Sequence, residues 1–221
     1  MSRDLHFLPK AILFDWDNTL VDTWGVIHES MNVTLKHMGQ NQWTIEETRK
    51  NVRKALREAF PELFGDRWEE ARDVFYKCFH AIHLERLEVK AGASDLLEYL
   101  SRKQIFLGVV SNKSGRSLRS EVRYLGWDNY FGSLVGASDA ARDKPARDPV
   151  DLALCSSGIN AGREVWFVGD TDVDIQCAHV SGCVSVLISQ SPFEEGGPKD
   201  FGAEMTFTSL EGFMALVSRR L

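Results

Sequence analysis

Two aspartates near the start of the chain have the type and spacing for metal-assisted chemistry. The run Ala11–Phe14 is continuously apolar, which favours a strand buried on both faces of a parallel sheet. Asp15 and Asp17 follow it, and ligands of open α/β sheets bind at the carboxyl ends of strands. Two carboxylates this close repel each other unless a proton or a hard cation such as Mg²⁺ compensates them. The simpler alternative is a polar turn that caps the next helix.

Other polar side chains also follow segments that have the pattern of buried strands. The apolar runs at residues 105–110 and 165–168 are each followed by such groups, and a polar loop at residues 137–149 carries another. The side chains are Ser111, Asn112, Lys144, Asp170 and Asp174. Because the carboxyl ends of parallel strands meet at one edge of a sheet, we expect these groups to share a site with the first two aspartates.

These residue types suit phosphoryl transfer from a phosphate monoester through an aspartyl-phosphate. Asp15 is the candidate covalent nucleophile. Asp17 points to the same side of an extended chain and is the candidate general acid and base. Asp170 would give a third carboxylate for Mg²⁺, which offsets charge on the transferring group. The sequence therefore favours a magnesium-dependent phosphoryl-transfer site.

The remaining groups are candidates for phosphate binding. The Ser111 hydroxyl and the Asn112 backbone N–H would hold phosphate oxygens, and the Lys144 ammonium would offset their charge. Each has a simpler explanation: Ser111 as a helix cap, Lys144 as an exposed lysine, and Asp170 with Asp174 as complements of a helix dipole. Their order, each after a buried strand, favours the shared site.

A helical insertion separates the first aspartates from the rest of the chain. Residues 22–87 have the apolar spacing of three amphipathic helices with no strand between them, which predicts a small bundle. Thr44 and Glu47 predict a capping box at the start of the second helix, which we expect to end at Pro61. An insertion placed directly after the acidic strand end suits a lid that excludes water.

From residue 89 onward, strands and helices alternate, which is typical of a parallel α/β sheet. We therefore expect a core domain of residues 1–21 and 88–221 and a helical cap domain of residues 22–87.

Composition excludes several classes of partner. The formal net charge is −6 with no long basic run, which disfavours nucleic-acid binding. We find no apolar run long enough to span a bilayer and no apolar signal-peptide core, so we expect no membrane association and a cytoplasmic location. The four cysteines form no CxxC pair and read as reduced thiols. The sequence leaves the oligomeric state open.

Four segments, FDWDNTLVD, VVSNK, DKP and GDTDVD, resemble the motifs of the haloacid dehalogenase (HAD) superfamily in order and spacing, over essentially the whole chain. The resemblance implies a doubly wound, Rossmann-like core with a helical cap between the first and second motifs. It also implies that Asp15 is nucleophile and metal ligand and that Asp17 is general acid/base and lends its carbonyl to Mg²⁺. Asp170 is implied as a metal ligand, with Asp174 supporting the metal waters or Lys144.

The substrate is expected to be a small phosphorylated metabolite. Asp17 argues for a phosphatase, since the branch that hydrolyses haloacids lacks this aspartate. The segment from VVSNK to VGASD resembles phosphoglycolate phosphatases, although Ser111 replaces their usual Thr and Ser114 stands where Pro is common. Phosphotransferase or phosphomutase activity is the alternative, and a non-catalytic phosphometabolite-binding module is a third reading. Lys113 and Arg116 are candidates for contact with a substrate carboxylate.

Overall fold

The computed structural model describes residues 9–52, 56–189, 193–194, 197–198 and 200–220. The chain divides into two compact units, one of Asp22–Glu88 and a larger one of the chain on either side of that segment. The short strands β2 (Val21–Asp22) and β3 (Glu88–Val89) lie at the two ends of the inserted segment and form a two-stranded sheet.

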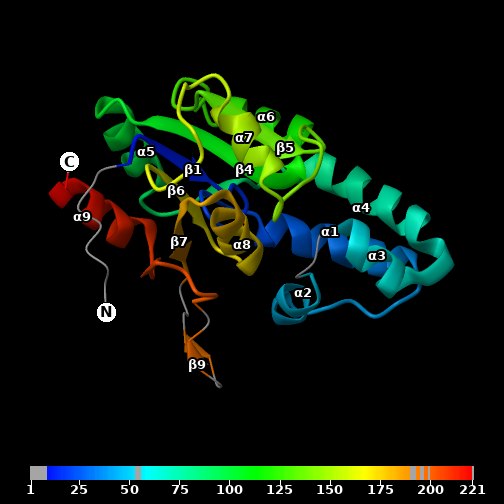
Figure 1. The fold of residues 1–221 in the computed structure, drawn as a ribbon. Coiled ribbons are helices and arrows are strands. Elements are labelled where there is room, and N and C mark those ends of the chain that lie inside the picture. The colour runs from blue at the N-terminus through cyan, green and yellow to red at the C-terminus, as the bar shows by residue number, and fades with distance from the viewer. Residues whose placement is uncertain (1–8, 53–55, 190–192, 195–196, 199, 221) are drawn as a thin grey trace. The chain divides into compact units, whose positions relative to one another are not determined.

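In the described part of the larger unit, six parallel strands form one sheet in the order β10-β7-β6-β1-β4-β5 (Figure 1). The strands are β1 (Ala11–Phe14), β4 (Phe106–Ser114), β5 (Ser133–Ala137), β6 (Val165–Gly169), β7 (Val184–Ile188) and β10 (Met205–Phe207). The helices of this unit are α5 (Ala93–Arg102), α6 (Gly115–Tyr124), α7 (Asp148–Leu154), α8 (Asp172–Ser181) and α9 (Leu210–Arg220). A separate antiparallel pair joins β8 (Phe193–Glu194) to β9 (Gly197–Pro198).

Helices cover both faces of the six-stranded sheet. Along β6, Val165 and Phe167 belong to an apolar cluster with residues of α7 and α8. Trp166, between them, points to the opposite face, and its ring centroid lies 6.2 Å from that of Phe213 in α9. All of β1 and β6 is buried, which explains their continuous apolar pattern. The predicted doubly wound, Rossmann-like α/β fold is confirmed.

The sheet differs from the prediction at two strands. The second predicted strand was expected to stop before Ser111, but β4 continues to Ser114, with a shift of its register against β5 after Val110. The edge strand β10 was not predicted, because it is only three residues long and its residues are half-buried or exposed. The segment Val184–Ile188 forms β7, within the region where alternating strands and helices were expected.

The smaller unit is helical, with α1 (Trp24–His37), α2 (Ile45–Asn51), α3 (Leu56–Phe64), a 3₁₀ turn (Gly65–Arg67) and α4 (Trp68–Ile82). An apolar cluster joins α1, α3 and α4; its buried members are Val26, Met31, Leu35, Phe60, Phe64, Ala71, Phe75 and Phe79. The predicted capping box is present: the Thr44 side chain accepts from the Glu47 N–H, and Glu47 accepts from the Thr44 N–H.

The expected end of the second helix was wrong. Helix α2 ends at Asn51, and Pro61 lies inside a further helix, α3. Proline inside a helix costs about 3 kcal/mol. Phe60 and Phe64, on either side of it, are both buried with ring centroids 5.2 Å apart, and burying a phenylalanine contributes about 1.5–3 kcal/mol. Packing of the two rings therefore offsets the loss at Pro61.

Candidate active site

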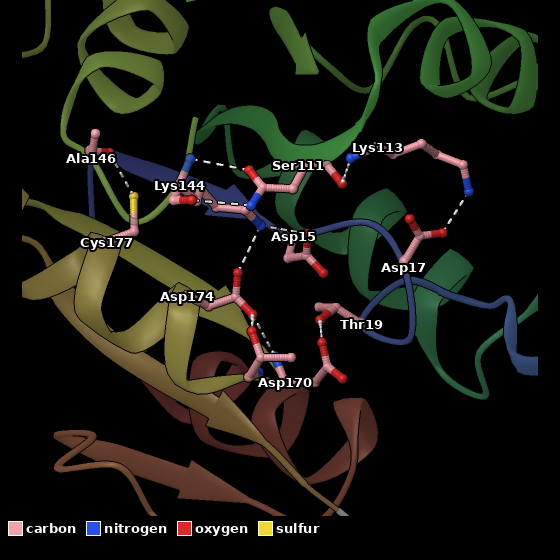
Figure 2. A network of polar contacts seen from close by, with 12 residues as sticks. Asp15, Asp17, Thr19, Ser111, Lys113, Lys144, Ala146, Asp170, Asp174 and Cys177 are labelled. Atoms are coloured by element: carbon pink, nitrogen blue, oxygen red, sulfur yellow. Dashed lines mark hydrogen bonds and ion pairs between the residues drawn. The ribbon is translucent and has the colours of Figure 1, made fainter. Parts of the chain in front are cut away.

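The polar side chains predicted to share a site lie together at the carboxyl ends of three adjacent strands of the larger unit. Strand β1 pairs with β6 on one side and with β4 on the other. The backbone N–H of Asp15 donates to the carbonyl of Val168 at 2.8 Å, so the ladder fixes the aspartate at the end of β1. Figure 2 shows Asp15, Asp170, Asp174 and Lys144 directed toward one another.

Lys144 is a buried cation held between two carboxylates. Its Nζ lies 2.6 Å from Oδ1 of Asp15 and 2.7 Å from Oδ1 of Asp174, and its side chain is 3% exposed. Burial opposes the charged form, but the two carboxylates prevail and raise the pKa of Lys144. The lysine is therefore an ammonium inside the site, and the reading of an ordinary exposed lysine is wrong.

Three carboxylates in this site could hold a metal ion. Oxygen atoms of Asp15, Asp170 and Asp174 lie within 4.8 Å of one another. Burial raises the pKa of Asp15 to about 7; Lys144 opposes this rise, and the charges of Asp174 and Asp17 add to it. Burial, with repulsion from Asp15 and Asp174, also raises the pKa of Asp170. The three carboxylates outnumber the single ammonium of Lys144 and offer only oxygen donors, which fits a hard divalent cation.

Asp174 has two roles in the geometry of the site. Its Oδ2 accepts the N–H groups of Asp170 and Thr171 at 3.2 and 3.0 Å and the Thr171 hydroxyl at 2.6 Å. A Cβ at Gly169 would come within 2.3–2.6 Å of the Asp174 side chain, so only glycine permits this approach. The carboxylate thus organises the start of α8, as the simpler reading expected, and also binds Lys144 through its other oxygen.

Asn112 and Thr19 fix neighbouring groups through their side chains. The amide of Asn112 donates to the carbonyl of Lys144 at 3.1 Å and accepts from its N–H at 3.0 Å. The Thr19 hydroxyl, which is fully buried, donates to Oδ1 of Asp170 at 3.2 Å. We expected only the backbone N–H of Asn112 to take part, so the clamp on Lys144 was missed. Ser111 is buried, and its hydroxyl accepts the N–H of Lys113 at 3.2 Å.

Lys113 pairs with residues of its own chain. Its Nζ lies 2.5 Å from Oδ1 of Asp17 and 3.0 Å from Oε2 of Glu121, and its side chain is 5% exposed. Burial opposes the charged form, but the two carboxylates prevail and raise the pKa of Lys113. Lys113 thus contacts two carboxylates of the protein, whereas the sequence suggested contact with a substrate carboxylate. Arg116 is exposed.

Glu121 was missed by the sequence reasoning. It is fully buried in α6 and accepts the indole N–H of Trp16 at 2.6 Å as well as contacting Lys113. A signal was present, because Leu118, Glu121 and Val122 have the i, i+3, i+4 spacing of one helix face, and both neighbours are apolar. A carboxylate in an apolar stripe is a candidate for a buried ion pair.

Residues 12–188 match the family model described as haloacid dehalogenase-like hydrolase. The chain belongs to this family. The resemblance stated from the four motifs is therefore confirmed.

Relatives of this hydrolase include two enzymes named as phosphatases. A pyrophosphatase PpaX of Anoxybacillus flavithermus is 28% identical over 173 residues, covering 78% of this chain and 80% of the relative. A phosphoglycolate phosphatase of Chromobacterium violaceum is 26% identical over 210 residues, covering 91% of this chain and 93% of the relative. Both alignments span most of each protein, which confirms the predicted class of phosphatase within the family.

Solved structures of similar fold belong to the same family. A haloacid dehalogenase-like hydrolase of Streptococcus pneumoniae has a TM-score of 0.83 at 22% identity, covering 94% of this chain and 98% of that one. A HAD-superfamily hydrolase of Ehrlichia chaffeensis has a TM-score of 0.68 at 27% identity, covering 96% of this chain and 98% of that one. Within the described residues of this hydrolase, we find no helix with the length and apolarity needed to cross a membrane.

Proposed function

We propose that this hydrolase is a Mg²⁺-dependent phosphatase that hydrolyses a small phosphate monoester through an aspartyl-phosphate on Asp15. One observation carries the proposal: the Lys144 ammonium lies between Asp15 and Asp174 where three carboxylates meet. A buried carboxylate beside a fixed cation and a metal-binding cluster is the arrangement that attack on a dianionic phosphate requires, because both cations offset the repulsion.

The metal would be held by Asp15 and Asp170, with the backbone carbonyl of Asp17 as a further ligand and Asp174 supporting its waters. When bound, Mg²⁺ supplies charge neutralisation for the transferring group. The raised pKa values of Asp15 and Asp170 support this assignment, because a bound cation would restore the ionised forms. The hydroxyl of Thr19 holds Asp170 in place for that role.

The protein's own residues would then divide the chemistry. Asp15 attacks phosphorus, and the electron pair of the broken P–O bond stays on the leaving oxygen. Asp17 gives its proton to that oxygen and later takes a proton from the water that hydrolyses the aspartyl-phosphate. The Ser111 hydroxyl, the Asn112 backbone N–H and the Lys144 ammonium bind the phosphate oxygens.

The helical unit, Asp22–Glu88, is proposed as the cap domain, with the core formed by the rest of the chain. Its place between the first and second motifs supports this, as it is the position of caps in the family that the chain resembles. We propose that the cap excludes water during phosphoryl transfer and contributes to substrate selection.

We propose a small phosphorylated metabolite of the phosphoglycolate type as substrate and the cytoplasm as location. The phosphoglycolate phosphatase among the relatives supports the substrate class. The pyrophosphatase relative makes inorganic pyrophosphate the second candidate. The four cysteines all lie in described parts of the chain and are free, which supports a reducing compartment.

Phosphate release from a panel of monoesters and pyrophosphate, with and without Mg²⁺, tests this function, with Asp15→Asn as control. Mg²⁺-dependent release that vanishes in the variant is the expected result, and the best substrate defines the specificity. Phosphorylated Asp15 without release would instead indicate a phosphotransferase. Neither release nor labelling would indicate a binding module and would overturn the proposal.

A further inference from the structure

The carboxylate of Asp17 has a fixed partner inside the protein. Lys113 reaches it from β4 with its Nζ 2.5 Å from Oδ1, while the Asp17 side chain remains 28% exposed (Figure 2). One oxygen of Asp17 is thus engaged by a buried ammonium on the protein side. The torsion of this side chain is therefore constrained from within the core unit.

Glu121 in turn fixes both Lys113 and the residue between the two aspartates. Its Oε2 lies 3.0 Å from the Lys113 Nζ and accepts the indole N–H of Trp16 at 2.6 Å. Trp16 is fully buried, and its ring packs edge-on against Trp127 with centroids 5.8 Å apart. A single carboxylate on α6 therefore holds the segment after β1 directly at Trp16 and, through Lys113, at Asp17.

Fold stability is a weak explanation for this arrangement. Glu121 is fully buried and the Lys113 side chain is 5% exposed. The desolvation of a buried ion pair offsets most of its attraction, and apolar residues of similar size are often equally stable. A buried pair that also contacts Asp17 is better explained by the geometry that it imposes on that carboxylate.

We propose that Lys113 and Glu121 are positioning residues that orient Asp17 for proton transfer to the leaving oxygen. This inference rests on the proposed function. Lys113 engages Oδ1, so Oδ2 of Asp17 carries the proton that the leaving oxygen takes as the P–O bond breaks and the bond from Asp15 to phosphorus forms. Glu121 acts through Lys113 and touches no reacting atom.

The leaving group of the substrate distinguishes this role from a general structural one. An alkyl phosphate needs its leaving oxygen protonated, whereas 2,4-dinitrophenyl phosphate leaves as a stable anion and does not. The ratio kcat/KM reports the steps up to transfer of phosphorus to Asp15, so it isolates this proton transfer. Lys113→Met should lower kcat/KM for the alkyl ester by about 10²-fold and for the dinitrophenyl ester by less than about threefold.

Three further variants complete the test. Lys113→Arg should restore at least about a tenth of the alkyl-ester activity, because the cation is retained. Glu121→Gln keeps an acceptor for the Trp16 indole but loses the negative charge. Its kcat/KM should fall less than that of Lys113→Met, and again more for the alkyl ester than for the dinitrophenyl ester. Lys10→Met is the matched control: it breaks a pair with Glu164 whose two side chains are 60% and 56% exposed, and should change neither rate.

A double-variant cycle tests whether Lys113 acts through Asp17. In an Asp17→Asn background, Lys113→Met should cause less than about a twofold further loss on the alkyl ester, since its target is gone. Equal losses on both esters, no loss on either, or full additivity with Asp17→Asn would each overturn the proposal.

Crystal structures separate this inference from the proposed function. In Lys113→Met, the side chain of Asp17 should leave the rotamer of the wild type while Trp16 and the sheet stay in place. An unchanged Asp17 rotamer would overturn the positioning role whether or not the enzyme turns over any ester. Absence of all hydrolysis by the wild-type protein, with Asp17 displaced in the variant, would instead overturn the phosphatase assignment alone.

Discussion

The Lys144 ammonium lies 2.6 Å from the Asp15 carboxylate, although 129 residues separate them in the chain. The contact joins the end of the first buried strand to the loop before α7, and Asp174 completes it from α8. Charged groups from three distant segments of the core unit therefore meet in this site.

Replacement of Lys144 should disable the phosphate site. Lys144→Met removes the cation that faces Asp15, and we expect kcat/KM to fall by about 10²-fold or more, as for loss of one preorganised donor. Phosphate release under saturating Mg²⁺ measures the effect. The Lys10→Met variant should retain full activity, and equal activity of the two variants would contradict the role of Lys144.

Asn112 should act by holding the backbone of Lys144. Asn112→Ala removes two hydrogen bonds to that backbone, which costs about 1 kcal/mol each in stability and displaces the ammonium. We expect a larger fall in kcat than change in KM. Unfolding in denaturant measures the loss of stability. Asn112→Asp keeps the hydrogen-bond acceptor but loses the donor. Its kcat and its stability should lie between those of the wild type and those of Asn112→Ala. Asn160→Ala, at an exposed loop position, is the control and should change neither quantity.

Thr19 should tune metal affinity through Asp170. Thr19→Val is close in size and removes the hydroxyl that donates to Oδ1 of Asp170. Loss of such a supporting contact weakens metal binding by about 10–100-fold, so the Mg²⁺ concentration for half-maximal activity should rise by this factor. Thr206→Val, at an exposed position in β10, is the matched control. An unchanged Mg²⁺ requirement in Thr19→Val would refute the assignment.

The contribution of Asp15 and Asp170 to the stability of the metal-free protein should fall as pH rises toward neutrality. Asp15 has a pKa raised from 3.8 to about 7 in the folded chain, and that of Asp170 is raised as well, so the folded state binds more protons than the unfolded state between these values. The stabilisation is complete below about pH 4 and is lost as pH rises through about 7.

Magnesium should reverse this trend, because it binds the ionised carboxylates. At 100 times its dissociation constant the ion would add about 2.7 kcal/mol to the unfolding free energy, and more at high pH than at low pH. Thermal unfolding in chelator and in excess Mg²⁺ across this pH range measures both effects. Asp15→Asn should flatten the pH dependence in chelator; an unchanged slope would contradict the pKa shift of Asp15.

Much of the fold and the grouping of the candidate site residues could be predicted, because both depend on local sequence patterns. Ala11–Phe14 is apolar throughout since both of its faces are buried, and two aspartates mark its end. Thr44 and Glu47 are three residues apart, and this spacing predicts their capping box from the sequence alone. Signals of this kind extend over a few residues and depend little on the rest of the chain.

Contacts between distant residues could not be predicted in the same way. The contact between Lys113 and Asp17 depends on the extension of β4 beyond Val110 and on its shifted register against β5. No local sequence pattern predicts either feature. Pro61 stays inside a helix because Phe60 and Phe64 pack against each other in the apolar cluster, so tertiary burial overrides a local stop signal. Propensity is a weak prior wherever packing contributes more free energy.

The two oxygens of Asp174 connect the proposed phosphate site to backbone amides whose hydrogen exchange can be measured. Oδ1 binds the ammonium of Lys144, while Oδ2 accepts the amide N–H groups of Asp170 and Thr171. Opening of the first turn of α8 would release all of these partners together. Hydrogen–deuterium exchange at those two amides should therefore slow when an anion occupies the site, which makes them built-in reporters of ligand binding.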